Sequence, residues 1–185
     1  MSDESASDET PLYPSGEDLS QEERTLFYSS VGQGISLWAS MEGCIVELAA
    51  KLLDTTTEKT GLIFYSIANF YAWISIVDQL FELEPKYSDY RRRWTIITAA
   101  LRALNDTRVR LAHHTTFDVD PDTWLALRPG RHDTRPKSLR HTPLTTMQIV
   151  KFSQSVVVVE KELREMLLEF ELAASKHRIE DGFDE

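Results

Sequence analysis

The sequence predicts an all-α protein, an antiparallel four-helix bundle with a long loop between the third and fourth helices. Apolar residues recur at steps of three and four over four long segments, and capping signatures precede these segments. Proline-rich sequence separates the last two segments. With 185 residues, of which 42 % are hydrophobic, the chain is long enough for one domain with a substantial core.

The first predicted helix spans about residues 21–53. Ser20 and Glu23 form a capping box, in which each side chain satisfies an otherwise unpaired backbone N–H. The helix contains three glycines, and each weakens it by about 1 kcal/mol relative to alanine. These glycines are Gly32, Gly34 and Gly43. We interpret them as places where another helix approaches closely.

The second predicted helix spans about residues 58–83, after a capping pair formed by Thr55 and Glu58. It is apolar on nearly all sides, which predicts burial against its own chain and against a second protomer. Its uncharged run TGLIFYSIANFYAWISIV has 18 residues, the lower limit for a membrane span. Because polar residues interrupt this run and no basic cluster adjoins it, we interpret it as a core helix and expect no membrane association.

Pro85 ends the second helix, and Ser88 or Asp89 is expected to cap the third, at about residues 89–113. The next segment, residues 115–143, lacks a helical period and contains four prolines, which indicates a long loop.

Within this loop, TWLAL at residues 123–127 has strand character and predicts a short hairpin across RPGR. The fourth predicted helix opens with a second capping pair, Thr145 and Gln148, and runs to about residue 176. Its VVVV run favours a strand locally, but the apolar spacing over the whole segment is helical.

Charged residues are segregated along the chain. Residues 1–19 are rich in Ser, Asp, Glu and Pro and are predicted to form a disordered acidic tail, and residues 177–185 form a second acidic tail. The predicted folded domain between them covers residues 20–176. Within it, residues 86–141 hold twelve basic and six acidic side chains. This basic region is the candidate for contact with an anionic partner.

A single cysteine, Cys44, excludes an internal disulfide, which fits a reducing compartment. Its place in the helical pattern predicts an inert packing residue. The first residues, MSDESASDET, have neither the basic nor the apolar region of a secretory signal. We therefore expect a cytoplasmic protein.

Arg108 occupies the centre of the apolar stripe of the third predicted helix. Its neighbours within about 60° on a helical wheel are Trp94, Ile97, Leu101, Leu104 and Leu111. A guanidinium keeps its positive charge, and burying that charge without a partner costs several kcal/mol. Arg108 therefore needs a carboxylate, carbonyl groups or a wet cleft.

Arg108 and His113, with four residues between them near the end of the third helix, resemble the signature of the HEPN superfamily of helical nucleotide-binding and ribonuclease domains. That signature is an arginine, four to six residues and a histidine, often as Arg-Asn-x-x-Ala-His. Leu111 and Ala112 also match its context, whereas Val109 stands where a polar residue is usual. The helical layout of about residues 21–176 resembles the family as well.

The resemblance implies a homodimer whose two motifs face each other across a cleft, and RNA cleavage without a metal ion or cofactor. His113 would remove the proton of a ribose 2′-hydroxyl, and Arg108 would stabilise charge on the phosphoryl oxygens, giving a 2′,3′-cyclic phosphate. Five residues of an ideal helix turn about 500°, so the two side chains point about 140° apart. A two-fold dimer would bring Arg108 of one chain to His113 of the other.

Four further residues are candidates for substrate binding. They are Arg102, Asn105, Arg110 and His114. Asn105 lies one turn before Arg108 and would orient it or a phosphate, whereas the arginines would follow a nucleic-acid backbone. The run of Arg91, Arg92 and Arg93 has the same interpretation. The alternative for all of them is an ordinary solvated helix surface paired with nearby acids.

Three hypotheses follow. The first is a HEPN-like ribonuclease, a toxin or defence effector with Arg108 and His113 at its site, for which an antitoxin-like protein partner is expected. The second is a non-catalytic HEPN-like dimer that binds a nucleotide, RNA or protein, and Val109 favours it. The third is a structural dimer in which Arg108 pairs with an acid such as Asp78 or Glu47. A metal site is not expected, because adjacent histidines on a helix diverge by about 100°.

Overall fold

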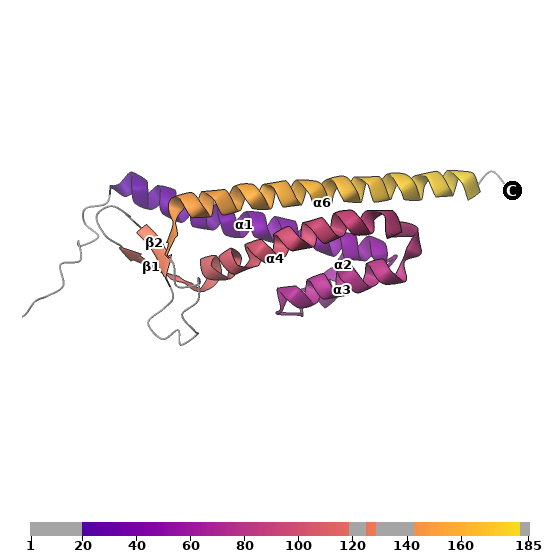
Figure 1. Ribbon diagram of the computed structural model, residues 1–185, viewed down its shortest axis with the longest axis horizontal. Helices are drawn as coiled ribbons and strands as arrows, with labels where there is room; N and C mark the ends of the chain where they lie inside the picture. Colours follow the sequence, from indigo (N-terminus) through magenta and orange to yellow (C-terminus); the bar gives the residue numbers. More distant parts are fainter. Residues whose placement is uncertain (1–19, 119–124, 129–142, 182–185) are drawn as a thin grey trace, which may run out of the picture.

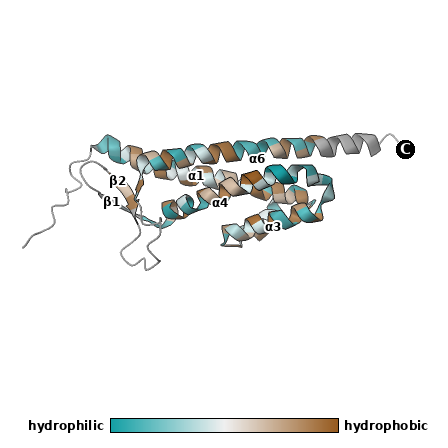
Figure 2. Cartoon of the chain, in the orientation of Figure 1, coloured by the Kyte–Doolittle hydropathy of each residue, from teal (hydrophilic) through white to brown (hydrophobic). Residues whose placement is uncertain are grey.

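The computed structural model of the chain describes residues 20–118, 125–128 and 143–181. These residues are mostly α-helical, as the sequence predicts, and they include three short strands at one end of an elongated molecule (Figure 1). Hydrophobic and hydrophilic residues alternate along the helices (Figure 2), as expected of helices that bury one side. The predicted tail of residues 1–19 and most of the predicted loop lie outside the described residues.

Helix α1 (Gln21–Leu52) begins at the predicted capping box. The Ser20 hydroxyl accepts the backbone N–H of Glu23 at 3.2 Å, and Oε2 of Glu23 accepts the backbone N–H of Ser20 at 3.0 Å. Both residues thereby satisfy N–H groups that have no partner within the helix. The prediction for the start of this helix is confirmed.

The predicted second helix is two helices, α2 (Thr57–Phe64) and α3 (Phe70–Leu83), so the single helix expected there is wrong. Asn69 starts α3 by accepting the backbone N–H of Tyr71 on its side-chain oxygen at 2.9 Å. The Trp73 indole N–H donates to the backbone carbonyl of Ile67 at 2.9 Å, which satisfies one carbonyl left open by the break.

The start of α2 also differs from its prediction by one residue. Thr56, rather than Thr55, accepts the backbone N–H of Lys59 on its hydroxyl oxygen. The two threonines are chemically equivalent caps, and the backbone conformation at Thr56, which is extended, decides between them.

A 3₁₀ helix, η1 (Pro85–Tyr90), leads directly into α4 (Arg91–His113). No side chain caps α4, so the expected cap at Ser88 or Asp89 is wrong. The preceding 3₁₀ turns supply backbone acceptors for the first N–H groups, and the N–H of Arg91 donates to the carbonyl of Ser88.

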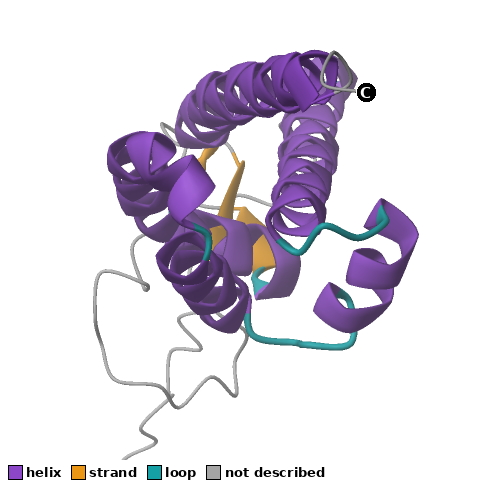
Figure 3. Cartoon of the chain, turned by 90° about the vertical axis from the view of Figure 1, so that its right-hand side faces the viewer, coloured by secondary structure: helices purple, strands orange, loops and turns teal. Residues whose placement is uncertain are grey.

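The three strands form one antiparallel sheet in the order β1 (Thr115–Asp118), β2 (Leu125–Arg128) and β3 (Leu144–Thr145). The strand predicted at residues 123–127 is confirmed from Leu125 onward. It pairs with β1 on one edge and with β3 on the other, whereas the residues that a hairpin across RPGR would join to it, 129–142, lie outside the described residues, so that hairpin stays a prediction. In Figure 3 the strands lie behind the near ends of the helices.

Helix α6 (Thr146–Asp181) begins at the predicted capping pair, where Thr145 N–H donates to Oε1 of Gln148 at 2.9 Å. It continues past residue 176, where we expected the helical domain to end. The VVVV run is helical, because Val156 and Val159 lie on the buried side of α6 with the rest of its apolar stripe.

Because of the break between α2 and α3, the long helices are not arranged as four antiparallel helices. Helices α1 and α6 run parallel (Figure 1). Ser40 contacts Glu160, and Lys51, further along α1, contacts Glu171, which is further along α6 by the same number of residues. Helix α4 runs antiparallel to α6. The described residues therefore form five α-helices with a parallel α1–α6 pair.

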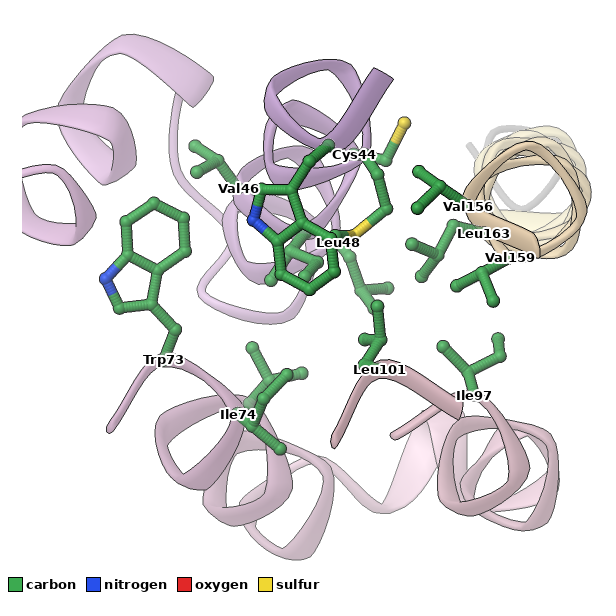
Figure 4. Close-up of a cluster of buried hydrophobic side chains, with 14 of the residues drawn as sticks. Cys44, Val46, Leu48, Trp73, Ile74, Ile97, Leu101, Val156, Val159 and Leu163 are labelled. Atoms are coloured by element: carbon green, nitrogen blue, oxygen red, sulfur yellow. The ribbon is translucent and has the colours of Figure 1, made fainter. Parts of the chain in front are cut away.

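The core lies around α1. Figure 4 shows apolar side chains of α3, α4 and α6 converging on it, and the labelled ones are Trp73, Ile74, Ile97, Leu101, Val156, Val159 and Leu163. At Gly34 three helices pack tightly together: a Cβ built there would lie 3.2 Å from Leu111 of α4 and 3.4 Å from Phe152 of α6. Close approach is thus confirmed at Gly34, whereas a Cβ built on Gly32 or Gly43 meets no heavy atom within 4 Å.

Among the described residues, no helix has both the length and the apolar composition needed to cross a membrane. The uncharged run that reached the lower length limit is divided between α2 and α3.

Cys44 is fully buried in this core, and burial raises the pKa of its thiol from the usual 9.0 to about 11. The nearby Arg164 opposes this shift.

We expect native protein to resist alkylation by iodoacetamide at pH 8, because the reactive thiolate is both scarce and enclosed. Because the thiol pKa is higher in the folded state than in the unfolded state, the contribution of Cys44 to the free energy of unfolding should fall as the pH rises from about 9 toward 11. Rapid alkylation of folded protein, followed by mass spectrometry, would contradict the expectation.

Candidate functional site

The Arg108–His113 motif lies in the last two turns of α4, beside the small sheet (Figure 1). Helix α4 stays α-helical through His113, and the N–H of His114 still donates to the carbonyl of Arg110 at 2.9 Å. The helix therefore neither tightens nor ends early enough to align the two side chains, which leave it about 140° apart. Within one chain the structure does not bring them onto one face, and the His113 side chain is exposed.

Arg108 pairs with Glu42 of α1. Its Nη2 lies 3.7 Å from Oε1 of Glu42, which is an ion-pair distance but too long for a hydrogen bond. The Arg108 side chain is 36 % exposed and that of Glu42 only 16 %. An acid on a neighbouring helix was expected for a structural role, but the acids suggested, Asp78 and Glu47, are wrong. The guanidinium is thus charge-compensated on one side and open to solvent on the other.

The Glu42 carboxylate is itself fixed by the core. The Trp38 indole N–H, one turn earlier on α1, donates to the same Oε1 at 2.6 Å. The Trp38 ring is buried and stacks near Phe152 and Phe70. A short hydrogen bond from a rigid buried donor holds this carboxylate in one position. Arg108 therefore faces a fixed negative charge rather than a mobile surface acid.

Asn105, one turn before Arg108, is buried, and its Oδ1 accepts no hydrogen bond from a described residue. A buried acceptor without a donor costs about 1–3 kcal/mol. The side chain therefore favours any ligand or water that brings a donor to this part of the α4 surface. The sequence prediction of Asn105 beside the motif arginine agrees with this position.

Arg110 is more deeply buried than Arg108, against the expectation that Arg108 would be the cation inside the helix packing. Burial lowers the pKa of Arg110, and the charge of Asp106 opposes that shift. Arg110 lies about 200° from Arg108 on the helical wheel, on the side of α4 away from its apolar stripe. This enclosure is unfavourable for contact with a nucleic-acid backbone, and a role of Arg110 in substrate binding stays a prediction.

Arg102 pairs with Asp78 of α3 at 3.4 Å, and the Trp94 indole N–H donates to the same carboxylate at 2.7 Å. These residues line a groove of about 490 Å³ between α3 and α4. Arg102 lies about 9 Å along α4 from Arg108, so the structure does not place it in the motif site.

The arginine run at the start of α4 is a packing feature. Arg93 contacts Glu162, Glu165 and Glu169 of α6 at 3.0, 3.0 and 2.9 Å. Arg91 pairs with Glu82. The alternative interpretation, pairing with acids of the last helix, is confirmed for Arg93, which fixes α4 against α6.

The remaining candidates are described only in part. His114 is half-buried, in extended backbone directly after α4, with a buried Nδ1. The loop side chains at positions 131, 135, 137 and 140 lie outside the described residues. In the described ranges, no three His, Cys, Asp or Glu side chains lie together as a metal site would require.

One contact of Arg108 and one buried polar side chain were not found from the sequence. Glu42 contacts Arg108. The sequence feature that could have identified it is an acidic residue one helical turn after Trp38 within an apolar stretch. Ser153 of α6 is buried, and its hydroxyl has no hydrogen-bond partner among the described residues. A serine in a helix carries no comparable sequence signal.

Comparison of the chain with family models, curated proteins and solved structures found no match.

Proposed function

We propose that this chain is a HEPN-like dimeric helical protein that cleaves RNA without a metal ion, as a toxin or defence effector in the cytoplasm. One observation carries the proposal: the motif arginine is held against a core-anchored carboxylate, Glu42, while about a third of its side chain stays open to solvent. Arg108 therefore presents donors to an anion from a fixed position. His113 lies exposed at the end of the same helix.

The proposed chemistry assigns one role to each side chain. His113 acts as the general base and removes the proton of the ribose 2′-hydroxyl. The oxygen attacks the adjacent phosphorus, and the bond to the 5′-oxygen of the next nucleotide breaks. Arg108 stabilises the charge that develops on the phosphoryl oxygens.

The dimer is part of the proposal because one chain is geometrically incomplete. Arg108 and His113 leave a regular helix about 140° apart, and both must reach the same phosphate. Two chains related by a two-fold axis solve this by joining Arg108 of one chain to His113 of the other. An antitoxin-like protein that covers this site is the expected binding partner.

The test is incubation of purified wild type and of His113→Ala with RNA in EDTA. Loss of the general base should reduce cleavage by about 100-fold or more. His113 is exposed at a helix end, so its variant should keep the wild-type melting temperature. Arg92→Ala, which removes an exposed side chain near the other end of α4, is the control substitution and should cleave normally. Equal cleavage by wild type and His113→Ala would remove the catalytic claim.

The second candidate is a non-catalytic module of the same type that binds RNA, a nucleotide or a protein. Val109 in the place of the usual polar residue favours it, as does the partial neutralisation of Arg108 by Glu42. In this case the wild type would retain RNA on the filter in a filter-binding assay, and Arg108→Ala would not. Neither protein would produce RNA with 2′,3′-cyclic phosphate ends.

A further inference from the structure

A surface groove of about 650 Å³ lies between α1 and α2. Val46 of α1 and Gly61 of α2 meet at its floor, since a Cβ built on Gly61 would lie 3.9 Å from Val46 and 3.7 Å from Tyr65. Val46 leaves α1 on the side away from α6 (Figure 4). The α1 wall is open at Gly43, where a Cβ would meet no heavy atom within 4 Å. The groove therefore has room for a side chain from outside the chain.

The α2 wall of this groove is apolar and exposed. Leu62 is 78 % exposed and Tyr65 is 62 % exposed. The Tyr65 ring lies edge-on to Trp73, with 5.3 Å between the ring centroids, so packing against α3 fixes its position. Exposed apolar surface gathered in one place marks an interaction site.

The groove continues along α1 as an apolar stripe. Ile35, Ala39, Gly43 and Val46 follow one another at steps of four, four and three residues, so they share one side of the helix. Ile35 is 44 % exposed and Ala39 is exposed, so the described residues leave much of this side uncovered. The stripe extends about 16 Å, or about three helical turns. A groove of this length between two helices suits an amphipathic helix that buries its apolar face there.

The charges in the groove are negative. Glu47 and Glu58 line it, and no Lys or Arg is among its lining residues. Arg164 acts on Glu47 through its charge but pairs with Glu160 at 2.7 Å. The backbone N–H of Glu58 and the Thr56 hydroxyl lower the pKa of the Glu58 carboxyl, which keeps it ionised at neutral pH. Neither carboxylate forms an ion pair with a cation among the described residues.

These carboxylates decide which kind of partner fits. They repel the phosphates of nucleic acids and of anionic lipids. They also repel residues 1–19 of this chain, which hold six acidic and no basic side chains. A partner with Lys or Arg beside its apolar residues supplies the missing counter-charges and covers the exposed apolar wall.

We propose that the α1–α2 groove binds a basic amphipathic helix of another protein. Its apolar side chains pack against Leu62, Tyr65 and the α1 stripe, and its Lys or Arg side chains pair with Glu47 and Glu58. The proposal does not depend on RNA cleavage, for which the candidate residues Arg108 and His113 lie on α4.

The probe is a fluorescently labelled peptide of about 18 residues, long enough to cover the stripe, with leucines on one helical face and lysines on the other. Its binding to the full chain is measured by fluorescence anisotropy. One control peptide has the same composition with the leucines scattered around the helix, and a second has glutamates in place of the lysines. The amphipathic basic peptide should bind at least about tenfold more tightly than either control.

Two variants of the chain locate the binding. Glu47→Lys reverses one charge of the groove, and Gly43→Gln fills it without a clash inside the chain and without a change of charge. Each should raise the dissociation constant of the peptide by at least about tenfold. Glu22→Lys makes the same charge reversal at the exposed start of α1, about 30 Å along the helix from Gly43, and should bind the peptide as wild type does.

Four results would overturn the proposal. The first is a wild-type chain that does not distinguish the basic amphipathic peptide from the two controls. The second is an equal loss of binding in Glu22→Lys and Glu47→Lys, which would attribute binding to net charge alone. The third is unchanged binding by Gly43→Gln and Glu47→Lys, with both shown to be folded by circular dichroism. The fourth is a wild-type dimer in sedimentation equilibrium that Gly43→Gln dissociates, since a second copy would then occupy the groove.

Discussion

Trp38→Ala should lower the free energy of unfolding by about 3–5 kcal/mol, the range for removal of a large buried aromatic. The Trp38 ring is buried between α1, α3 and α6, where it contacts Phe70 and Phe152. Its removal leaves a cavity that close-packed helices fill poorly. It also takes the indole donor away from Glu42, so the carboxylate opposite Arg108 loses its short hydrogen bond. Urea denaturation followed by circular dichroism measures the loss.

Trp38→Phe separates the two effects. Phenylalanine keeps most of the apolar contact but has no N–H, so its loss should be about 1.5–3 kcal/mol, the range for a hydrogen bond to a charged group. A Trp38→Ala protein that loses less than about 1 kcal/mol would show that the ring is not packed as described. If Trp38→Phe lost as much as Trp38→Ala, the hydrogen bond to Glu42 would account for the whole effect.

Gly34→Val should destabilise the protein by about 2–3 kcal/mol, through overpacking rather than through a cavity. A Cβ at this position already lies 3.2 Å from Leu111 of α4 and 3.4 Å from Phe152 of α6, and valine adds two methyl groups to it. The closest approach of three helices must then widen. The widening also moves Leu111, which lies three residues after Arg108, so the RNA binding that we propose should weaken together with stability.

Gly32→Val is the matched control for this prediction. It makes the same substitution two residues earlier in α1, where a Cβ meets no heavy atom within 4 Å. Its free energy of unfolding should stay within about 0.5 kcal/mol of wild type. Equal losses in Gly32→Val and Gly34→Val would attribute the effect to valine in a helix rather than to the close contact at Gly34.

Helix starts were the most predictable part of the fold, because capping is a local interaction. The pairs Ser20–Glu23 and Thr145–Gln148 are each three residues apart, and both form the predicted hydrogen bonds. The apolar stripe of α6 was equally predictable. Its members Ile149, Phe152, Val156, Val159, Leu163, Met166 and Phe170 are all buried. Periodicity outweighed the strand preference of four consecutive valines because burial of the whole stripe contributes more than local propensity.

The candidate site was predictable in its residues but not in its contacts. Arg108 was identified from its place in an apolar stripe, and the need for a compensating acid followed from its charge. Which acid compensates it depends on how α1 lies beside α4, and Glu42 is 66 positions away in the chain. The burial of Arg110 was not predicted either, because it depends on the tertiary packing of α4.

The sequence by itself determined the helical class, the capped starts of α1 and α6, the buried stripes and the position of the motif. Each depends on groups within about one or two helical turns, so the order of residues is sufficient. Only the tertiary structure decided the break between α2 and α3, the parallel pairing of α1 with α6, and the partner of Arg108. These depend on the contact of segments far apart in the chain, where the free energy comes from joint burial that no local pattern encodes.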